Sequence, residues 1–348
     1  MTAVSVLILH PTAPAEAGPL ARAVSAARYQ GAQRHAAGFA AAGAAQIEIV
    51  SGPDGRPFGA RLRSIVAGLA PRAGLVVLGS GAVPRITPLE RRTFIAAAAG
   101  PRPVALANNR YSADIVAVAR AAETLADMPD LDADNGLPRW LAESAGIEVR
   151  DLRGRWRLGL DIDGPLDLVL LGDPWARHLE GDQRALVADR LAAVRGLAEN
   201  RRAELLVAGR TSAASLAWLE RATAARTRAW VEERGLRTSA IGQRPPASVL
   251  GALLERDGPS SLGSHLARFA EAAIIDSRVL LAHRCGPDER GWPASEDRFA
   301  SDLLLAERIA DPWLRELTAS AAGAPIPVLL GGHTLVGPGL RLAVRQAR

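Results

Sequence analysis

The sequence predicts an α/β protein built from two domains. Short apolar runs bounded by Gly or Pro alternate with longer stretches rich in Ala, Leu and Arg. This pattern is typical of buried strands of a largely parallel sheet that are connected by helices. The chain has 348 residues, more than the ~100–200 residues usual for one domain. We therefore expect two α/β domains, the second with a mostly parallel sheet.

The order of the runs gives the predicted elements. Strands are expected over residues 4–9, 47–50, 75–78, 104–107, 158–162, 205–208, 228–231, 274–281 and 326–330. Helical spacing of apolar residues predicts the main helices over 19–45, 182–200, 213–225 and 295–322. From these elements we expect a first domain over 1–172, a connecting helix over 173–200 and a second domain over 201–348.

Charge composition excludes some functions. Lysine is absent, so all 42 basic residues are arginine, and with 37 acids the formal net charge is +5. A P-loop lysine, a Schiff-base lysine and a lysine general base are therefore excluded. The arginines are dispersed among acids, as where Arg201 and Arg202 lie near Glu199 and Glu204. We see no basic block interleaved with aromatic residues, and we expect no nucleic-acid partner.

Cysteine content and hydropathy point to a cytoplasmic protein. The single cysteine, Cys285, excludes an intramolecular disulfide and a cysteine-based zinc site within one chain. Residues 1–10 lack a charged n-region and are expected to form a strand rather than a signal peptide. No apolar stretch approaches the ~18–20 residues that cross a bilayer. We expect a soluble cytoplasmic protein with no membrane partner, and the sequence is compatible with a homo-oligomer.

The most specific motif is Leu-Asp-Ile-Asp-Gly-Pro-Leu-Asp-Leu at residues 160–168. A predicted strand ends in two alternating acids, a Gly-Pro turn follows, and a third acid opens the next helix. Alternation would place Asp161 and Asp163 on one face, where they could bind a divalent ion. Asp167 would lie in the first helical turn, where a carboxylate favours the helix dipole. A helix cap flanked by solvated acids explains the same residues equally well.

Together with three other segments, this motif resembles small nucleotidyltransferases of the GT-A (Rossmann-like) fold. The relatives in question are the 2-phospholactate guanylyltransferases and the molybdenum-cofactor guanylyltransferases. Residues 160–168 resemble their closing motif Asp-Ile-Asp-x-Pro-x-Asp-Leu, and residues 75–88 resemble their central strand followed by Asp-Leu-Pro-Leu-(Leu/Ile)-Thr-Pro. Residues 108–116 lie where the family has its acceptor loop, and residues 137–145 resemble the helix before the last strand. The resemblance covers residues 1–172.

The resemblance implies a GT-A fold and a reaction. A nucleoside monophosphate would pass from an NTP, GTP by analogy, to a phosphorylated small-molecule acceptor, with Mg²⁺ as cofactor. The implied metal ligands and catalytic residues are Asp161 and Asp163. The implied nucleotide contacts are Gly18, Arg22, Gly79, Ser80, Asn108 and Asn109.

Three departures from the family pattern leave a second interpretation open; one is that the glycines of the family's acceptor loop are absent around Asn108 and Asn109. The family aspartate that precedes Leu-Pro and binds the metal corresponds to Ala82, and the loop around Gly18 lacks the family's glycine run and lysine. Losing one of two carboxylates weakens a Mg²⁺ site strongly. The alternative is therefore a catalytically inactive nucleotide-binding, small-molecule-binding or regulatory protein that uses this domain as a scaffold.

The second half carries a different set of candidate residues, whose role is open. A strand predicted over 205–208 runs into Gly-Arg-Thr-Ser, which predicts an anion site at a helix N-terminus; an N-cap by a hydroxyl residue is the alternative. Histidines near the ends of later elements would join it, since ligands of parallel sheets lie at the carboxyl ends of strands. Asp276 and Arg278, two apart in a predicted strand, are expected to form ion pairs. The candidates for this second, anion-preferring site are Arg210, Thr211, Ser212, His283 and His333.

Overall fold

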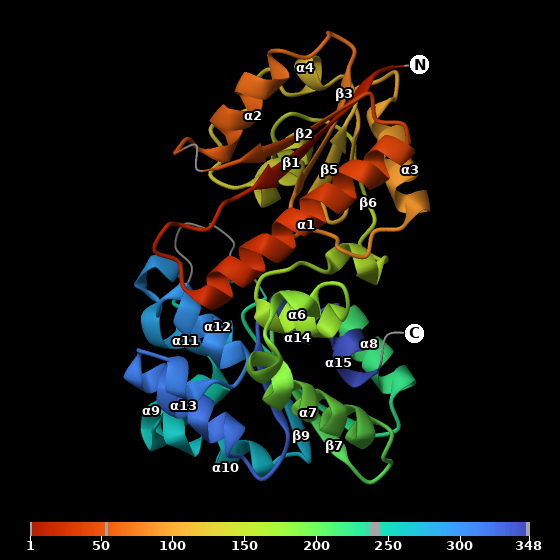
Figure 1. The fold of residues 1–348 in the computed structure, drawn as a ribbon. Helices are drawn as coiled ribbons and strands as arrows, with labels where there is room; N and C mark the ends of the chain where they lie inside the picture. Colours follow the sequence, from red (N-terminus) through yellow and green to blue (C-terminus); the bar gives the residue numbers. More distant parts are fainter. Residues whose placement is uncertain (1, 53–54, 235, 237–243, 346–348) are drawn as a thin grey trace. The chain divides into compact units, whose positions relative to one another are not determined.

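The computed structural model describes residues 2–52, 55–234, 236 and 244–345, and within them the chain forms two compact α/β units (Figure 1). The first unit comprises residues 1–14 and 25–162, and the second comprises residues 15–24 and 163–348. The α/β class predicted from the sequence is confirmed. Residues 173–200, which we expected to connect two domains, belong to the second unit.

The first unit contains a mixed sheet. Its strands are β1 (Val4–His10), β2 (Gln46–Ser51), β3 (Gly74–Gly79), β4 (Ala105–Ala107), β5 (Ile115–Val118) and β6 (Val149–Asp151), in the order β2-β1-β3-β5-β4-β6. β1 is parallel to β2 and to β3, and β4 is parallel to β6. β5 is antiparallel to both of its neighbours, β3 and β4. β5 and β6 were not predicted from the sequence.

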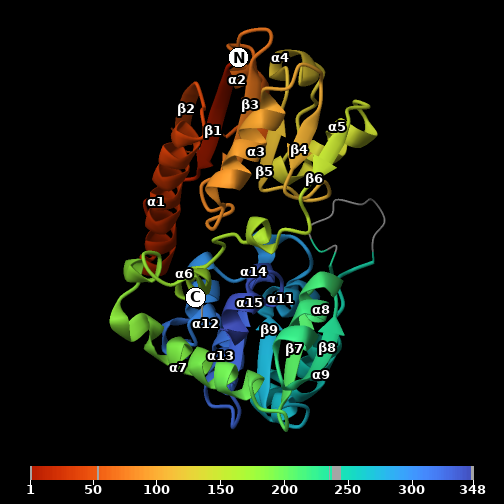
Figure 2. The same cartoon turned by 90° about the vertical axis from the view of Figure 1, so that its right-hand side faces the viewer.

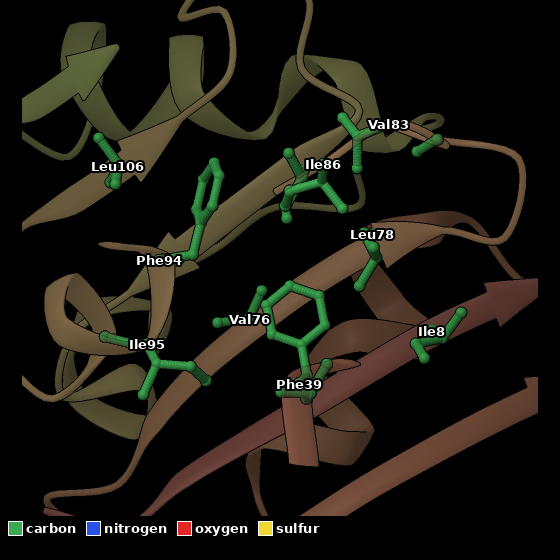
Figure 3. Packing of buried hydrophobic residues seen from close by; sticks show 14 of the residues in the cluster. Ile8, Phe39, Val76, Leu78, Val83, Ile86, Phe94, Ile95 and Leu106 are labelled. Atoms are coloured by element: carbon green, nitrogen blue, oxygen red, sulfur yellow. The ribbon is translucent and has the colours of Figure 1, made fainter. Parts of the chain in front are cut away.

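Helices cover both faces of this sheet and produce two apolar cores. On one face, α1 (Pro19–Ala41) and α3 (Pro88–Ala98) pack through Phe39 and Phe94, as Figure 3 shows. On the other face lie α2 (Phe58–Val66), α4 (Ala121–Thr124) and α5 (Leu137–Glu143). Side chains alternate along a strand, so Ile8 of β1 enters the first core and Leu7 enters the second. Burial on both faces explains why the strands are continuous apolar runs.

The second unit contains a four-stranded sheet that is parallel throughout. Its strands are β7 (Glu204–Gly209), β8 (Arg226–Val231), β9 (Ala272–Asp276) and β10 (Val328–Gly331), in the order β10-β9-β7-β8. α7 (Gly181–Ala198) packs on β7, β9 and β10 (Figure 2). The other helices are α6 (Pro165–Leu171), α8 (Ala213–Ala222), α9 (Val249–Asp257), α10 (Leu262–Ala267), α11 (Ser277–Cys285), α12 (Ser295–Asp302), α13 (Pro312–Ala322), α14 (His333–Val336) and α15 (Leu340–Val344).

Three predicted elements differ from the structure. The strand over 158–162 is instead a 3₁₀ turn, Trp156–Gly159, followed by an isolated bridge at Asp161. The strand over 274–281 ends at Asp276, and the Leu- and Ala-rich residues after it form α11. The long helix over 295–322 is two helices. α13 begins afresh at Pro312, whose missing N–H is tolerated in a first turn, with Asp311 as its N-cap.

Candidate functional site

Each sheet has a strand with the next two strands of the chain on its opposite sides, which makes a topological switch point. In the first unit the chain passes from β1 to β2 on one side and then to β3 on the other side of β1. In the second unit it passes from β7 to β8 and then to β9 on the other side of β7. In open α/β sheets ligands bind outside the carboxyl ends of the strands at such switch points. The two candidate sites are therefore the β1/β3 edge and the β7/β9 edge.

Polar side chains meet at the β1/β3 edge. His10 ends β1, Ser80 follows β3, both are buried, and His10 Nδ1 shares a 3.1 Å hydrogen bond with Ser80 Oγ. Burial, together with the charge of Arg28 on α1, lowers the pKa of His10, so its ring is neutral at pH 7. Tyr29, the next residue on α1, places its ring centroid 5.2 Å from that of His10, and 43% of Tyr29 is exposed. This edge therefore presents neutral hydrogen-bonding groups, one arginine and an accessible ring.

The loop after β3 faces the closing motif directly. Ala82 and Asp161 pair in an isolated antiparallel bridge. Gly81 accepts a hydrogen bond from the Ile162 amide, 3.1 Å long, and a Cβ at Gly81 would lie 3.0 Å from Asp161 Oδ1. Arg28 Nε donates to the Ile162 carbonyl over 2.6 Å. The position that matches the family's metal aspartate is thus adjacent to Asp161, but it holds a buried methyl group.

A buried histidine of α1 is hydrogen-bonded to the loop that contains Ala82. His35 of α1 donates from Nε2 to the Ala82 carbonyl over 2.8 Å. Its Nδ1 is buried and has no hydrogen-bond partner among the described residues. Burial, together with the nearby charges of Arg91 and Arg34, lowers the pKa of His35 to about 4. The loop therefore depends on a neutral imidazole.

The remaining nucleotide-contact candidates of the first unit have structural partners. Asn108 is buried; its Nδ2 donates to Asp114 Oδ2 and to the Leu158 carbonyl, and its Oδ1 accepts from the Asp114 and Ile115 amides. Asn109 Oδ1 accepts from the Tyr111 amide over 3.0 Å. The Gly79 amide donates to the Asp114 carbonyl over 3.3 Å, at the end of β3. The Asn108 side chain thus fixes the β4–β5 connection.

The start of α1, where the resemblance places phosphates, holds an internal carboxylate. The Leu20 and Ala21 amides donate to Glu296 Oε1 and Oε2 over 2.9 and 3.0 Å. The same carboxylate leaves no room for a Cβ at Gly18, and Arg22 donates to the Ala17 carbonyl. Free amides at a helix N-terminus are a natural anion site, and here the anion is supplied by the protein.

Asp163 and Asp167 belong to the second unit. Asp167 Oδ2 accepts from the Asp163 and Gly164 amides, each over 2.8 Å, and caps α6. Burial of Asp167, together with the charge of Asp163, raises its pKa well above the usual value. The cap that we left as an alternative for this motif is present.

The residues of the first unit do not fit the two-carboxylate Mg²⁺ site that the resemblance implies. Asp161 lies at the β1/β3 edge, where its Oδ1 accepts from the Ile162 amide over 2.8 Å, but Asp163, the other implied ligand, belongs to the second unit. Mg²⁺ in phosphate chemistry is usually held by one or two carboxylates together with substrate phosphates. Within the described ranges, no three His, Cys, Asp or Glu side chains are grouped as metal ligands.

At the β7/β9 edge, the charged side chains are buried and paired. Arg210 donates from Nε and Nη2 to the two Asp276 oxygens, over 2.6 and 3.1 Å. Arg278 binds both oxygens of Asp302, with 2.7 Å between Nη2 and Oδ2. Burial alone would lower the pKa of Arg278, but its attraction to Asp302 and the hydrogen bonds to it raise that pKa overall. The ion pairs expected for Asp276 and Arg278 thus exist, but each residue has its own partner.

The other second-site candidates also have internal partners. Thr211 donates to the Val336 carbonyl, and Ser212 is the N-cap of α8, where its Oγ accepts from the Ser215 amide over 3.1 Å. His283 lies on α11, not at a strand end, and its Nδ1 accepts from the Ser248 amide over 3.1 Å. His333 begins α14 directly after β10. Arg210, Thr211, Ser212 and His333 therefore follow strand ends as expected, and His283 does not.

Sequence reasoning missed His10, Arg28 and Asp302 as residues of these two edges, and Glu296 as the acceptor at the start of α1. His10 had a signal, because it ends the first predicted strand. The other three lie on helices, and no motif marks the register at which a helix faces a strand end. Among the described residues, no helix is both long enough and apolar enough to cross a bilayer. No protein-family model matches this chain, and a search of curated proteins finds no similar sequence.

Proposed function

We propose that the first unit binds a nucleoside triphosphate, GTP by the family resemblance, at the β1/β3 edge, and that it does not catalyse metal-dependent nucleotidyl transfer. One observation carries this proposal: Ala82 pairs with Asp161 in the bridge between the two motifs. This pairing supports the proposal, because the position that the resemblance assigns to a second metal carboxylate lies beside Asp161 and holds alanine. The protein would then act as a nucleotide-dependent binding or regulatory protein.

Arg28 is the residue we assign to the phosphates. Its charge acts on His10 and its Nε lies at the closing motif, so the cation is central to the edge. The start of α1 is less suited to phosphate, because Glu296 already accepts from the Leu20 and Ala21 amides. A guanidinium binds phosphate oxygens through paired N–H groups, which gives it a role in binding that needs no metal.

Nucleotidyl transfer to a phosphorylated small molecule is the second candidate function. The observation that favours it is Asp161, which stands beside the position where a second ligand would complete the site. In such reactions cations and positioning supply most of the rate. A single carboxylate together with the nucleotide phosphates would then hold Mg²⁺.

Titration calorimetry with each NTP, in Mg²⁺ and in EDTA, separates the two candidates. We expect GTP to bind with similar affinity in both buffers, and we expect no pyrophosphate release with phospholactate-type acceptors. Arg28→Gln should weaken binding roughly 10- to 150-fold, the size of a lost charge-assisted hydrogen bond of about 1.5–3 kcal/mol. Absence of binding by every NTP would overturn the proposal, and pyrophosphate release by the wild type would favour transfer.

Ala82→Asp, with Ala82→Asn as its uncharged match, tests the missing ligand itself. If Asp161 lacks only this partner, Ala82→Asp should make GTP binding depend on Mg²⁺, whereas Ala82→Asn should not. Because Ala82 is 3% exposed, circular dichroism of both variants must first show a native fold. Identical Mg²⁺ dependence of the two variants would contradict the assignment of this position.

A further inference from the structure

A second feature of the first unit lies at the carboxyl ends of β4 and β6. We call it the basic–aromatic strip, and it consists of Arg85, Arg110, Tyr111, Arg153, Arg155, Trp156 and Arg157. β4 and β6 are parallel neighbours, and Ala107 pairs with Asp151 at their ends. The loops that leave these two strands therefore start side by side and bring residues 110–111 and 153–157 together.

The first half of the strip is organised around Tyr111. The Cζ atoms of Arg110 and Arg153 lie 5.5 and 5.0 Å from the centroid of its ring. Tyr111 is 53% exposed. The Asn109 side chain holds the loop by accepting from the Tyr111 amide. An aromatic ring is thus presented to solvent between two guanidinium groups.

The second half continues the same chemistry. The Arg157 Cζ lies 5.3 Å from the centroid of the Trp156 ring. Arg85 precedes Glu90, whose Oε1 lies 3.7 Å from Arg155 Nη1. Burial and then the charge of Arg157 lower the pKa of Arg85. The Arg155 side chain between the two halves is 44% exposed. Segments that are remote in the sequence therefore form one surface.

The strip carries more positive than negative charge. Its arginines pair with Asp151, 2.8 Å from Arg153 Nε, and more loosely with Glu90, 3.7 Å from Arg155 Nη1. Arg110 and Arg157 stand beside the two aromatic rings, so the surface around Tyr111 and Trp156 is rich in guanidinium groups. A polyanion with planar rings is complementary to it.

We propose that the basic–aromatic strip binds single-stranded nucleic acid. Guanidinium groups would contact successive phosphates, and bases would stack on Tyr111 and on the exposed part of Trp156. An exposed strip of this kind suits an extended strand of about four nucleotides, the lower end of the range of single-strand sites. The strip was missed in the sequence although Arg153, Arg155 and Arg157 lie within five residues around Trp156; Arg85 and Arg110 come from two other segments. This site is independent of nucleotide binding at the β1/β3 edge.

Fluorescence anisotropy with labelled oligothymidylate, oligouridylate and a matched duplex tests the proposal on the full chain. We expect the single strands to bind more tightly than the duplex, with affinity falling as salt rises. Tyr111→Ala should weaken binding about 5- to 150-fold, as for the loss of one stacked base, whereas Tyr111→Phe should bind like the wild type. Arg153→Gln should reduce the slope of log K against log salt by about 0.7.

Arg221→Gln is the matched control, since Arg221 is an exposed arginine of α8 in the second unit. It removes the same charge from another surface and should leave oligonucleotide binding unchanged. An equal loss in Arg221→Gln and Arg153→Gln would overturn the proposal, because binding would then follow net charge alone. Wild-type affinity in Tyr111→Ala, or equal affinity for duplex and single strand, would also overturn it.

Discussion

Both sheets have a topological switch point at the carboxyl ends of their strands, but the buried side chains at these two edges differ in charge. At the β1/β3 edge the buried polar groups are neutral: His10 bonds to Ser80, and the buried Ala82 pairs with Asp161. At the β7/β9 edge the buried groups are charged, and Arg210 and Arg278 are each bound by an aspartate. At the first edge Arg28 Nε donates to the Ile162 carbonyl and the Tyr29 ring is 43% exposed, whereas at the second edge the buried charges pair with one another.

This difference shows that a charged residue at a strand end is not necessarily available to bind a ligand. The element that packs over the edge decides whether a charge is neutralised internally. Asp302 comes from α12 and pairs with both Arg278 nitrogens, whereas Arg28 of α1 donates from Nε to a backbone carbonyl at the β1/β3 edge. We therefore infer that the paired charges of the second edge fix its structure, while the first edge is the one suited to a ligand.

The largest effect should come from breaking the buried pair of the second edge. Asp276 is 1% exposed and Arg210 is 6% exposed. Asp276→Ala would leave the Arg210 guanidinium buried without its partner, and the free energy of unfolding of the second unit should fall by about 3–5 kcal/mol. Denaturant titration followed by circular dichroism measures the loss.

Two further variants test whether burial causes this loss. Arg228→Ala removes an exposed partner of Glu204 and should cost at most about 1 kcal/mol. The double change Asp276→Leu with Arg210→Met removes both buried charges and should recover much of the lost stability. A loss below about 1 kcal/mol in Asp276→Ala would show that water reaches this edge, which would remove the contrast between the two edges.

A smaller effect should appear with pH in the first unit. The pKa of His35 is about 4 in the folded protein against 6.5 ordinarily, so the unfolded chain binds the proton more readily between these values. The contribution of neutral His35 is complete above pH ~6.5 and is lost as pH falls toward 4. Between pH 7.5 and pH 5 the free energy of unfolding should drop by about 2 kcal/mol from this group alone.

His35→Gln isolates that contribution, because its side-chain amide can still donate to the Ala82 carbonyl but does not titrate. Burial also lowers the pKa of His10 and of His178, so the wild type and the variant share those slopes. The difference between the two proteins at pH 5 and 7.5 is the quantity to measure. If the free energies of unfolding of the two proteins change in parallel with pH, protonation of His35 does not destabilise the fold. The first edge would then not depend on a neutral His35.

The sequence predicted the fold class because a strand that is buried on both faces of its sheet is apolar at every position. Runs such as residues 75–78 and 205–208 are apolar at every position, and each is a central strand of its sheet. β5, residues 115–118, was missed even though the turn formers Asn108, Asn109, Ser112 and Asp114 separate it from β4. The antiparallel direction of β5 is set by hydrogen bonds with β3 and β4, which local sequence does not encode.

The candidate sites were predictable only where one segment carried the information. The motif at 160–168 correctly indicated a helix opened by Pro165 with Asp167 in its first turn. It could not reveal that Asp161 lies against Ala82, since that bridge joins segments about 80 residues apart. Nor could it reveal that Glu296 accepts from the start of α1. Such pairings depend on which helix covers which strand end.

The smallest predicted effect compares helix caps in the two units. Thr87 accepts from the Glu90 amide over 3.2 Å at the start of α3, and Ser212 accepts from the Ser215 amide over 3.1 Å at the start of α8. Thr87→Ala and Ser212→Ala should each cost about 1 kcal/mol, and the matched glycine variants only a few tenths, because glycine is tolerated at an N-cap. If Ser212 instead served an anion at the second edge, inorganic phosphate would raise the melting temperature of the wild type more than that of Ser212→Ala. Equal shifts in both proteins would place Ser212 with Thr87, as a cap, and would leave the first edge as the ligand-binding one.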